Sequence, residues 1–248
     1  MGRLLLPDGI DACLFDLDGV ITQTAKVHAA AWAEMFDDYL ARRGALSGDS
    51  HEPFSHDDYL AHVDGKLRLD GVRSFLASRG ISLADGGPDD PPMAETIHAL
   101  GARKNELFLE VLGRDGVDVY ESSVAVVDAA RAAGLRTAVV SASRNCAAIL
   151  DVAGLADRFE VRIDGVVAAE RGLPGKPAPD TFLAAAGDLG VAPEHAVVVE
   201  DAVSGVEAGR AGAFGYVVGV DRTGNRAALL AAGADIVVTD LGELMAPS

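Results

Sequence analysis

Two acidic pairs in the chain each follow a short apolar run. Asp16 and Asp18 come directly after the run at residues 10–15, and Glu200 and Asp201 close a later run. Short runs of this kind are typical of buried strands in a parallel sheet. Open α/β sheets bind their ligands beyond the carboxyl ends of the strands. We therefore expect these four carboxylates to lie together at one edge of a sheet.

Four neighbouring carboxylates repel each other, and the repulsion raises the pKa of each group. A hard divalent cation removes this conflict, and a set of oxygen ligands that leaves room for waters favours Mg²⁺. Lys176 lies in a loop rich in Pro and Gly after another apolar run, and it adds a further positive charge. The sequence therefore predicts Mg²⁺ as the cofactor.

Ser141 follows an apolar run at residues 136–140 and precedes a segment with helical character. A hydroxyl beside the free amides of a helix N-terminus forms an anion site. A metal, an anion site and a free carboxylate together suit phosphoryl transfer. In such a reaction Asp16 could attack phosphorus and form an aspartyl-phosphate, and Asp18 could give and take the proton of the leaving or attacking oxygen.

The elements that must position these groups alternate along the second half of the chain. Alternating strands and helices predict a parallel sheet with helices on both faces, so the expected fold class is α/β with a Rossmann-like doubly wound sheet. Strands are expected at residues 10–15, 136–140, 159–163, 196–199, 216–220 and 236–238. Helices are expected at residues 124–133, 145–152, 179–189, 203–211 and 226–232.

Residues 24–115 break this alternation. We interpret them as a helical domain inserted into a core domain that comprises residues 1–23 and 116–248. Lys104 lies on the apolar stripe of the helix expected at residues 96–112. The helices expected in the insert are 27–42, 71–76 and 96–112, and the polar loops between them are 44–58 and 84–92.

The ordered motifs resemble those of the haloacid dehalogenase (HAD) superfamily, and the match covers nearly the whole chain. The residues that carry the resemblance are Asp16-Leu17-Asp18-Gly19-Val20, Ser141, Lys176-Pro177 and Glu200-Asp201. The helical insert is similar to the helical cap domain of that superfamily. The finer resemblance is to the β-phosphoglucomutase-like subfamily, and it is carried by residues 16–32, Arg103-Lys104-Asn105 and Ser141-Ala142-Ser143-Arg144-Asn145.

The resemblance implies roles in catalysis and metal binding. Asp16 would be the nucleophile and a metal ligand, whereas Asp18 would be the general acid/base and would offer its carbonyl to Mg²⁺. Thr24 would lie at the hinge of the cap, and His28 would help to position Asp18 and the substrate. The implied catalytic set is Asp16, Asp18, Thr24, His28 and Lys176, and the implied metal ligands are Asp16, Asp18, Glu200 and Asp201.

The resemblance also implies two phosphate sites. Ser141 and Lys176 would hold the transferring phosphate, and Lys104 would point inward from the cap. The family's cap arginine ends a Gly-x-x-Arg pattern, whereas here the arginine of Gly71-Val72-Arg73-Ser74 comes one position early. Gly71 and Arg73 are therefore candidates, and they compete with Lys66 and Arg68. The residues implied for the second phosphate are Ser143, Arg144 and Asn145, and the neighbouring Ala142 belongs to the implied substrate- and phosphate-binding set.

A mutase and a phosphatase of this superfamily would share the same covalent step. A phosphatase lets water attack the aspartyl-phosphate, whereas a mutase excludes water and presents a sugar hydroxyl. The resemblance and the second phosphate site favour a mutase that interconverts β-D-glucose 1-phosphate and glucose 6-phosphate. The alternative is a HAD phosphatase that acts on a sugar phosphate or another small phosphomonoester. A binding protein that has lost catalysis is disfavoured, because Asp16, Asp18 and Asp201 are all present.

Composition limits the remaining functions. Asp and Glu outnumber Lys and Arg by 38 to 21, and the resulting net charge of −17 disfavours nucleic acid and membrane surfaces as partners. The two cysteines, Cys13 and Cys146, form no CxxC pair, which disfavours a disulfide scaffold and a cysteine zinc site. The sequence contains no secretory or membrane-spanning pattern. We therefore expect a cytoplasmic monomer or weak homo-oligomer whose partner is a small phosphorylated sugar.

Overall fold

The computed structural model describes residues 3–48, 50–63 and 68–246. Over these residues the chain divides into two compact units. The first, here called the core unit, comprises Met1–Thr24 and Val117–Ser248. The second, here called the cap unit, comprises Ala25–Gly116. The cap unit is thus inserted between the first strand of the core unit and the remainder of its sheet.

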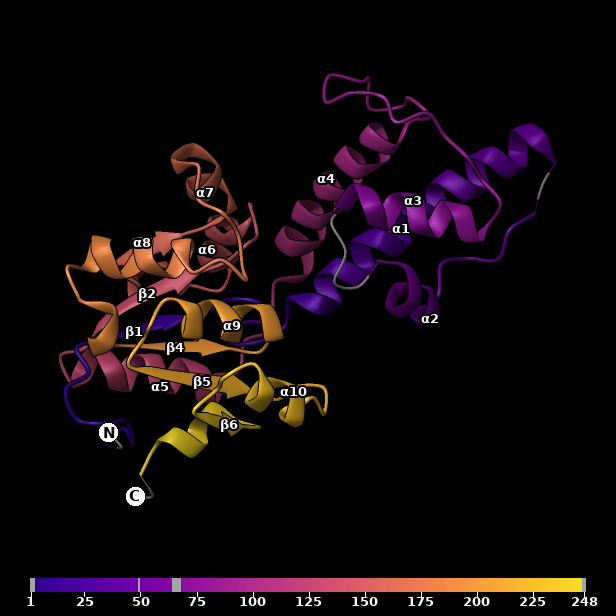
Figure 1. The fold of residues 1–248 in the computed structure, drawn as a ribbon. Coiled ribbons are helices and arrows are strands. Elements are labelled where there is room, and N and C mark those ends of the chain that lie inside the picture. Colours follow the sequence, from indigo (N-terminus) through magenta and orange to yellow (C-terminus); the bar gives the residue numbers. More distant parts are fainter. Residues whose placement is uncertain (1–2, 49, 64–67, 247–248) are drawn as a thin grey trace. The chain divides into compact units, whose positions relative to one another are not determined.

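The core unit is built on a parallel sheet, which contains six strands within the described residues in the order β3-β2-β1-β4-β5-β6 (Figure 1). The strand order reverses between β1 and β4, and open sheets bind their ligands at this kind of switch point. The expected doubly wound α/β fold is confirmed. The strands are β1 Ala12–Phe15, β2 Arg136–Val140, β3 Val161–Ile163, β4 Ala196–Glu200, β5 Tyr216–Val220 and β6 Ile236–Val238.

The register of the three central strands fixes where their polar residues meet. Phe15 of β1 pairs with Val139 of β2 on one side and with Val199 of β4 on the other. The next residue of each strand therefore lies at the same level of the sheet. This alignment brings Asp16 beside Glu200 at the carboxyl edge, because neighbouring strands lie only about 4.8 Å apart.

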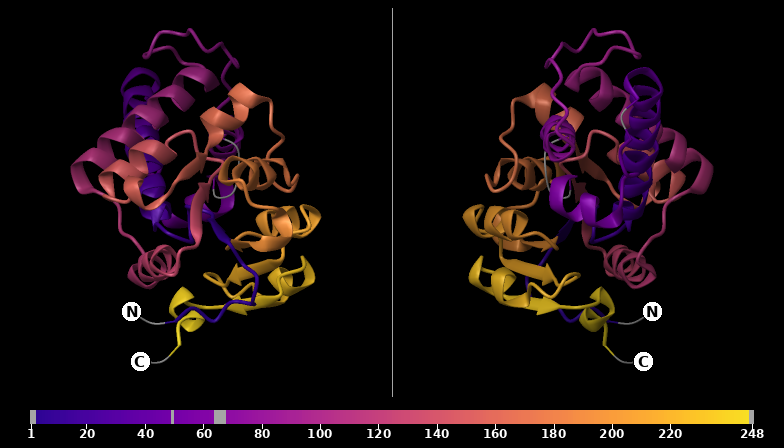
Figure 2. Two further views of the ribbon diagram at one scale, coloured as in Figure 1. Left: turned by 90° about the vertical axis from the view of Figure 1, so that its left-hand side faces the viewer. Right: turned by 90° about the vertical axis from the view of Figure 1, so that its right-hand side faces the viewer.

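Helices of the core unit lie on both faces of the sheet (Figure 2). Successive side chains of a strand point to opposite faces, so Leu14 packs in one cluster with Phe182 and Phe15 lies against Phe159 at 6.3 Å between ring centres. The helices are α5 Glu121–Ala132, α6 Cys146–Val152, α7 Gly165–Arg171, α8 Asp180–Leu189, α9 Val203–Ala211 and α10 Arg226–Ala231, with short 3₁₀ turns at Ala156–Arg158, Pro193–His195 and Leu241–Leu244.

The cap unit is helical and has an aromatic core of its own. The rings of Phe36 and Phe75 lie 4.0 Å apart, and Phe54 stacks on Phe36 at 5.3 Å. Thr96 begins the last helix, since its hydroxyl accepts the N–H of Ala99 at 3.1 Å. The helices are α1 Thr24–Ser47, α2 His56–Asp58, α3 Arg68–Ser78 and α4 Ile97–Asp115, and a π-helical turn, η1, spans Tyr59–Val63.

Several elements differ from the sequence-based expectation. Helix α1 begins before and ends after the expected range 27–42, and it includes part of the segment interpreted as a polar loop. Helix α7 was not predicted, although Asp164 caps its start and Gly172 ends it with φ +65°. None of the helices within the described ranges is long and apolar enough to cross a bilayer.

Candidate active site

Asp16 is the first residue after β1, and it is almost fully buried. Its backbone N–H donates to the Val199 carbonyl at 2.9 Å, and its carboxylate accepts a hydrogen bond from Lys176 at 2.5 Å. The same Lys176 ammonium lies 2.5 Å from a carboxylate oxygen of Glu200 and donates to the Val140 carbonyl at 3.1 Å. One buried cation therefore joins the ends of β1, β2 and β4.

The carboxylates around Lys176 outnumber it. Burial raises the pKa of Asp16, and the lowering effect of Lys176 is opposed by the charges of Glu200, Asp18 and Asp201. Burial, Glu200 and Asp18 also raise the pKa of Asp201 to about 7. Conversely, Asp16 and Glu200 overcome the effect of burial and raise the pKa of the Lys176 ammonium. The cluster thus has a deficit of positive charge.

This deficit fits a bound metal ion. Asp16, Glu200 and Asp201 each offer a carboxylate oxygen, and these three oxygens lie within 4.8 Å of one another. A set made only of oxygen donors suits a hard cation. The predicted fourth ligand residue, Asp18, lies two residues beyond Asp16 in the same loop. The residues present therefore form a cluster that can hold a metal.

A glycine makes room for one of these carboxylates. Gly19 has φ +82°, and a Cβ built on it would lie 1.9 Å from the Oδ2 atom of Asp201. Glycine is required here for its conformation and also because the Asp201 carboxylate occupies the space of a side chain. Gly205 plays a similar part for Glu200, whose Oε1 would lie 1.8 Å from an added Cβ.

Replacing Gly19 by Ala is expected to weaken the binding of a divalent cation to this cluster by at least about tenfold, because the new methyl group displaces Asp201. Calorimetric titration with Mg²⁺ measures the effect. The matched control is Gly134→Ala, because Gly134 has φ +83° and no atom within 4 Å of an added Cβ. Both variants carry a backbone strain of about 1–2 kcal/mol, so only the Gly19 variant should lose affinity. Equal affinities in the two variants would refute the steric argument.

Asp18 is held by two hydroxyls. The Thr24 hydroxyl donates to its Oδ1 atom, and the Ser141 hydroxyl donates to its Oδ2 atom at 3.3 Å. Burial raises the pKa of Asp18 even though both hydroxyls act to lower it. A carboxyl with a raised pKa exchanges protons more readily near neutral pH, as a general acid/base requires.

The loop after β2 is held in place by its own hydroxyls and by the chain around α7. The Ser143 N–H donates to the Ser141 hydroxyl at 3.0 Å, and the Asn145 N–H donates to the Ser143 hydroxyl at 3.1 Å. Gly165 donates its N–H to the Ser143 carbonyl at 3.1 Å. An added Cβ on Gly165 would lie 2.5 Å from the Ala142 carbonyl oxygen and 3.1 Å from Arg144.

Gly165 was not singled out in the sequence, although the Asp164-Gly165 pair that opens α7 signals a helix start. The five residues Ser141 to Asn145 lie together at the carboxyl end of β2, with Ser141 buried and Arg144 exposed. The structure therefore brings the phosphate-site candidates of the core unit into one loop beside Asp18.

In the cap unit, the buried Lys104 is paired with the partly buried His28. The Lys104 Nζ lies 2.6 Å from the His28 Nδ1, and it also lies 5.2 Å from the Trp32 ring centre and 5.0 Å from that of Phe108. Burial, Lys104 and Arg68 lower the pKa of His28 to about 3. The imidazole is therefore neutral near pH 7 and accepts the hydrogen bond of the ammonium.

The two remaining cap candidates lie in other surroundings. Arg73 donates to Asp70 at 2.8 Å and to Asp85 at 2.9 Å on the exposed side of α3. Gly71 faces Trp32, whose ring lies 3.2 Å from an added Cβ, so a larger residue here would crowd the indole. Of the two competitors of Arg73, Arg68 acts together with Lys104 to lower the pKa of His28, and Lys66 lies outside the described residues.

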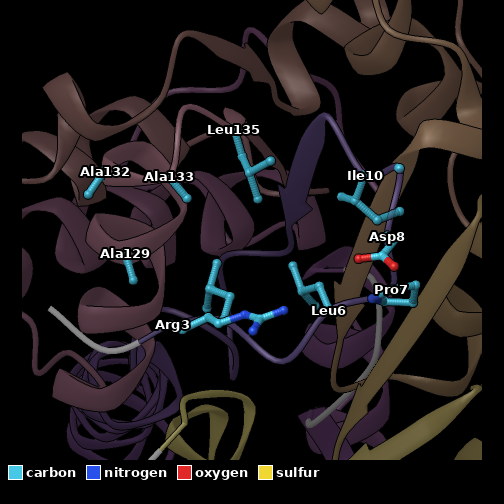
Figure 3. Close-up of a pocket in the computed structure, with 11 residues that line it drawn as sticks. Arg3, Leu6, Pro7, Asp8, Ile10, Ala129, Ala132, Ala133 and Leu135 are labelled. Atoms are coloured by element: carbon cyan, nitrogen blue, oxygen red, sulfur yellow. The ribbon is translucent and has the colours of Figure 1, made fainter. Parts of the chain in front are cut away.

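A cavity of about 470 Å³ lies at the opposite end of β1 from the carboxylates (Figure 3). Its wall consists of the segment before β1, the end of α5 and the residues that follow α5, with Leu6, Ile10, Ala132 and Leu135 among the apolar residues. Arg3 and Asp8 are the charged groups on this wall. The cavity shares no residue with the carboxylate cluster, so its size gives no information about the reaction.

Comparison with known proteins places this geometry in a family. A family model described as haloacid dehalogenase-like hydrolase matches residues 10–212. The β-phosphoglucomutase of Mycobacterium bovis is 54% identical over 245 residues, which cover 97% of this chain and 93% of that protein. An identity of this size over nearly the full length of both chains extends to the cap as well as the core.

Solved structures agree with this result. One solved structure is that of a HAD family hydrolase from Deinococcus radiodurans R1 with bound phosphate and sodium. It superposes on this chain with a TM-score of 0.70 at 29% identity, and the match covers 98% of this chain and 100% of that chain. The β-phosphoglucomutase from Clostridium difficile shares the fold with a TM-score of 0.67 at 24% identity, covering 95% and 93%. The chain therefore belongs to the haloacid dehalogenase superfamily and, within it, to the β-phosphoglucomutase-like subfamily of phosphoryl-transfer enzymes.

Proposed function

We propose that the protein is a Mg²⁺-dependent β-phosphoglucomutase that interconverts β-D-glucose 1-phosphate and glucose 6-phosphate. The observation that carries the proposal is the buried Asp16, whose carboxylate lies against Lys176 at 2.5 Å and within the cluster of Glu200 and Asp201. The identity of 54% to a β-phosphoglucomutase supports the choice of reaction.

The first chemical step is the attack of an Asp16 carboxylate oxygen on phosphorus, which forms an aspartyl-phosphate and releases the sugar oxygen. Asp16, Glu200 and Asp201 would hold Mg²⁺ together with the backbone carbonyl of Asp18. The ion would partly neutralise the charges of the phosphate and the carboxylates, so that the Asp16 carboxylate can approach the phosphate. Lys176 adds a fixed positive charge at the same place, since it already contacts Asp16.

Asp18 would carry the proton in both directions. It protonates the leaving sugar oxygen in the first step and accepts a proton from the attacking sugar hydroxyl in the second. Thr24 and Ser141 hold the two oxygens of its carboxyl group, so Asp18 reaches the reaction in a defined orientation. Ser141 would contact the transferring phosphate as well.

The second phosphate of the bisphosphate intermediate would be bound by Ser143, Arg144 and Asn145 in the core unit. Within the cap unit, we propose Lys104 and Arg68 as phosphate-binding residues, and not Arg73. Lys104 is paired with a neutral imidazole in the cap interior, whereas Arg73 is engaged by Asp70 and Asp85. The stem of Arg68 lies over Gly101, whose added Cβ would be 3.8 Å from the Arg68 Cδ atom.

Phosphorus NMR tests the proposal directly. Purified protein with Mg²⁺, β-D-glucose 1-phosphate and a trace of the 1,6-bisphosphate is expected to produce a glucose 6-phosphate signal without free phosphate. A sample with EDTA should show no conversion, and added Mg²⁺ should restore it. Inorganic phosphate as the main product would instead make the protein a sugar phosphatase. A lack of any change would exclude this substrate pair.

A further inference from the structure

Arg222 lies in the turn between β5 and α10, far along the chain from either catalytic aspartate. The turn is closed by side-chain hydrogen bonds, because the Asp221 carboxylate accepts the N–H groups of Gly224 at 2.7 Å and Asn225 at 2.8 Å. These hydrogen bonds lower the pKa of Asp221 despite the opposing effect of burial. The backbone that carries Arg222 is therefore held in place by these hydrogen bonds.

The Arg222 guanidinium makes contacts with three separate segments of the core unit. Its Nε donates to the Gly19 carbonyl at 2.8 Å, and its terminal nitrogen donates to the Thr239 carbonyl at 3.1 Å. Its flat face lies 3.5 Å from the ring centre of Tyr120. A planar guanidinium can stack and donate in its own plane at the same time, which a lysine ammonium cannot do.

The contacts with the Gly19 carbonyl and the Tyr120 ring both act on the loop that carries the catalytic aspartates. Gly19 follows Asp18, and its N–H donates to the Thr22 carbonyl at 2.9 Å, which closes the loop. The N–H of Tyr120 donates to the Ile21 carbonyl at 2.9 Å. Arg222 thus binds the aspartate loop and also the segment, residues 117–120, by which the chain returns from the cap unit to the core unit.

A small displacement at Gly19 would disturb the site in two ways. The Asp18 carbonyl, our proposed metal ligand, is joined directly to the Gly19 nitrogen by the peptide bond. The Asp201 carboxylate also fills the space next to the Gly19 Cα. Displacement of reacting groups by about 1 Å can lower a rate by about 100-fold.

We propose that Arg222 is a positioning residue for phosphoryl transfer, which holds the aspartate loop through the Gly19 carbonyl and the Tyr120 ring. The proposal rests on the proposed function only for the choice of substrate. It predicts that loss of Arg222 lowers kcat and leaves KM within about twofold, because the guanidinium touches the loop and not the sugar.

The test compares Arg222→Met with Arg226→Met. Arg226 is the first residue of α10, directly after this turn, and it donates to the Val237 carbonyl of β6 at 2.7 Å, so it controls for the loss of a nearby arginine. Arg222→Met is expected to lower kcat by about 10- to 100-fold and to speed hydrogen exchange of the backbone amides in residues 17–22. Arg226→Met is expected to do neither.

If Arg222→Met fails to fold, Arg222→Lys replaces it. The lysine keeps the charge and one donor but not the stacking geometry, so an intermediate loss of kcat is expected. Equal kcat in the Arg222 and Arg226 variants, or unchanged exchange in residues 17–22, would overturn the proposal. The exchange measurement needs no substrate. A wild-type protein without mutase activity would therefore refute the proposed function. The exchange measurement would still decide whether Arg222 holds the aspartate loop.

Discussion

Asp16→Asn is expected to lower the rate of phosphoryl transfer by more than about 10⁴-fold, because an amide cannot form the covalent intermediate. The substitution keeps the shape of the side chain, and Lys176 retains its ion pair with Glu200 at 2.5 Å. The fold should therefore persist. Turnover of β-D-glucose 1-phosphate in a coupled assay measures the loss, and mass spectrometry of the intact protein after exposure to acetyl phosphate detects the phosphorylated enzyme.

A carboxylate outside the site provides the control for Asp16→Asn. Asp188 forms an ion pair with Arg171 at 2.8 Å on an exposed part of the core unit. Asp188→Asn should keep full activity and should still become phosphorylated. If Asp16→Asn turned over substrate within about tenfold of the wild-type rate, Asp16 would not be the nucleophile.

Asp18→Asn is expected to lower sugar turnover by about 10²- to 10⁴-fold, the usual contribution of a general acid/base. The expected loss depends on the leaving group. A sugar oxygen needs a proton when it departs, whereas acetate leaves acetyl phosphate without one. The variant should therefore still accept phosphate from acetyl phosphate on Asp16, as intact-protein mass spectrometry would detect, and then fail to pass it to the sugar.

Two results would contradict the acid/base assignment for Asp18. One is sugar turnover at the wild-type rate. The other is an equal loss with acetyl phosphate and with the sugar phosphate, because that pattern indicates a disturbed site and not a missing proton. Thr24→Val serves as a comparison, since it removes one hydroxyl from Asp18 and keeps the carboxyl group. A smaller loss is expected for Thr24→Val than for Asp18→Asn.

The sheet and the acidic cluster could be predicted from the sequence because both depend on local patterns. An apolar run that ends in an acidic residue indicates a strand and its polar end, and the carboxyl ends of parallel strands share one edge. Asp16 and Glu200 obey this rule. Helix α7 follows the same local logic through Asp164, but its short apolar stretch gives a weak signal.

Arg222 could not be identified in this way, and Arg68 could not be distinguished from its cationic neighbours, since the environment of both residues depends on tertiary packing. Lys66, Arg68 and Arg73 lie close together in the sequence of the cap, and their spacing does not indicate which of them lies near the Lys104–His28 pair. Arg73 is held instead by Asp85, twelve residues away. The Arg222 contact with Gly19 spans 203 residues, which no local pattern records.

The register of β1, β2 and β4 has a consequence for how the protein tolerates change over evolution. The spacing between Asp16 and Glu200 is set by backbone hydrogen bonds between strands, and not by the side chains beneath them. Interior residues such as Val198 can therefore be exchanged for others of similar volume at a cost of less than about 1.5 kcal/mol. Thermal stability can then drift between species while the distances among the reacting groups remain the same.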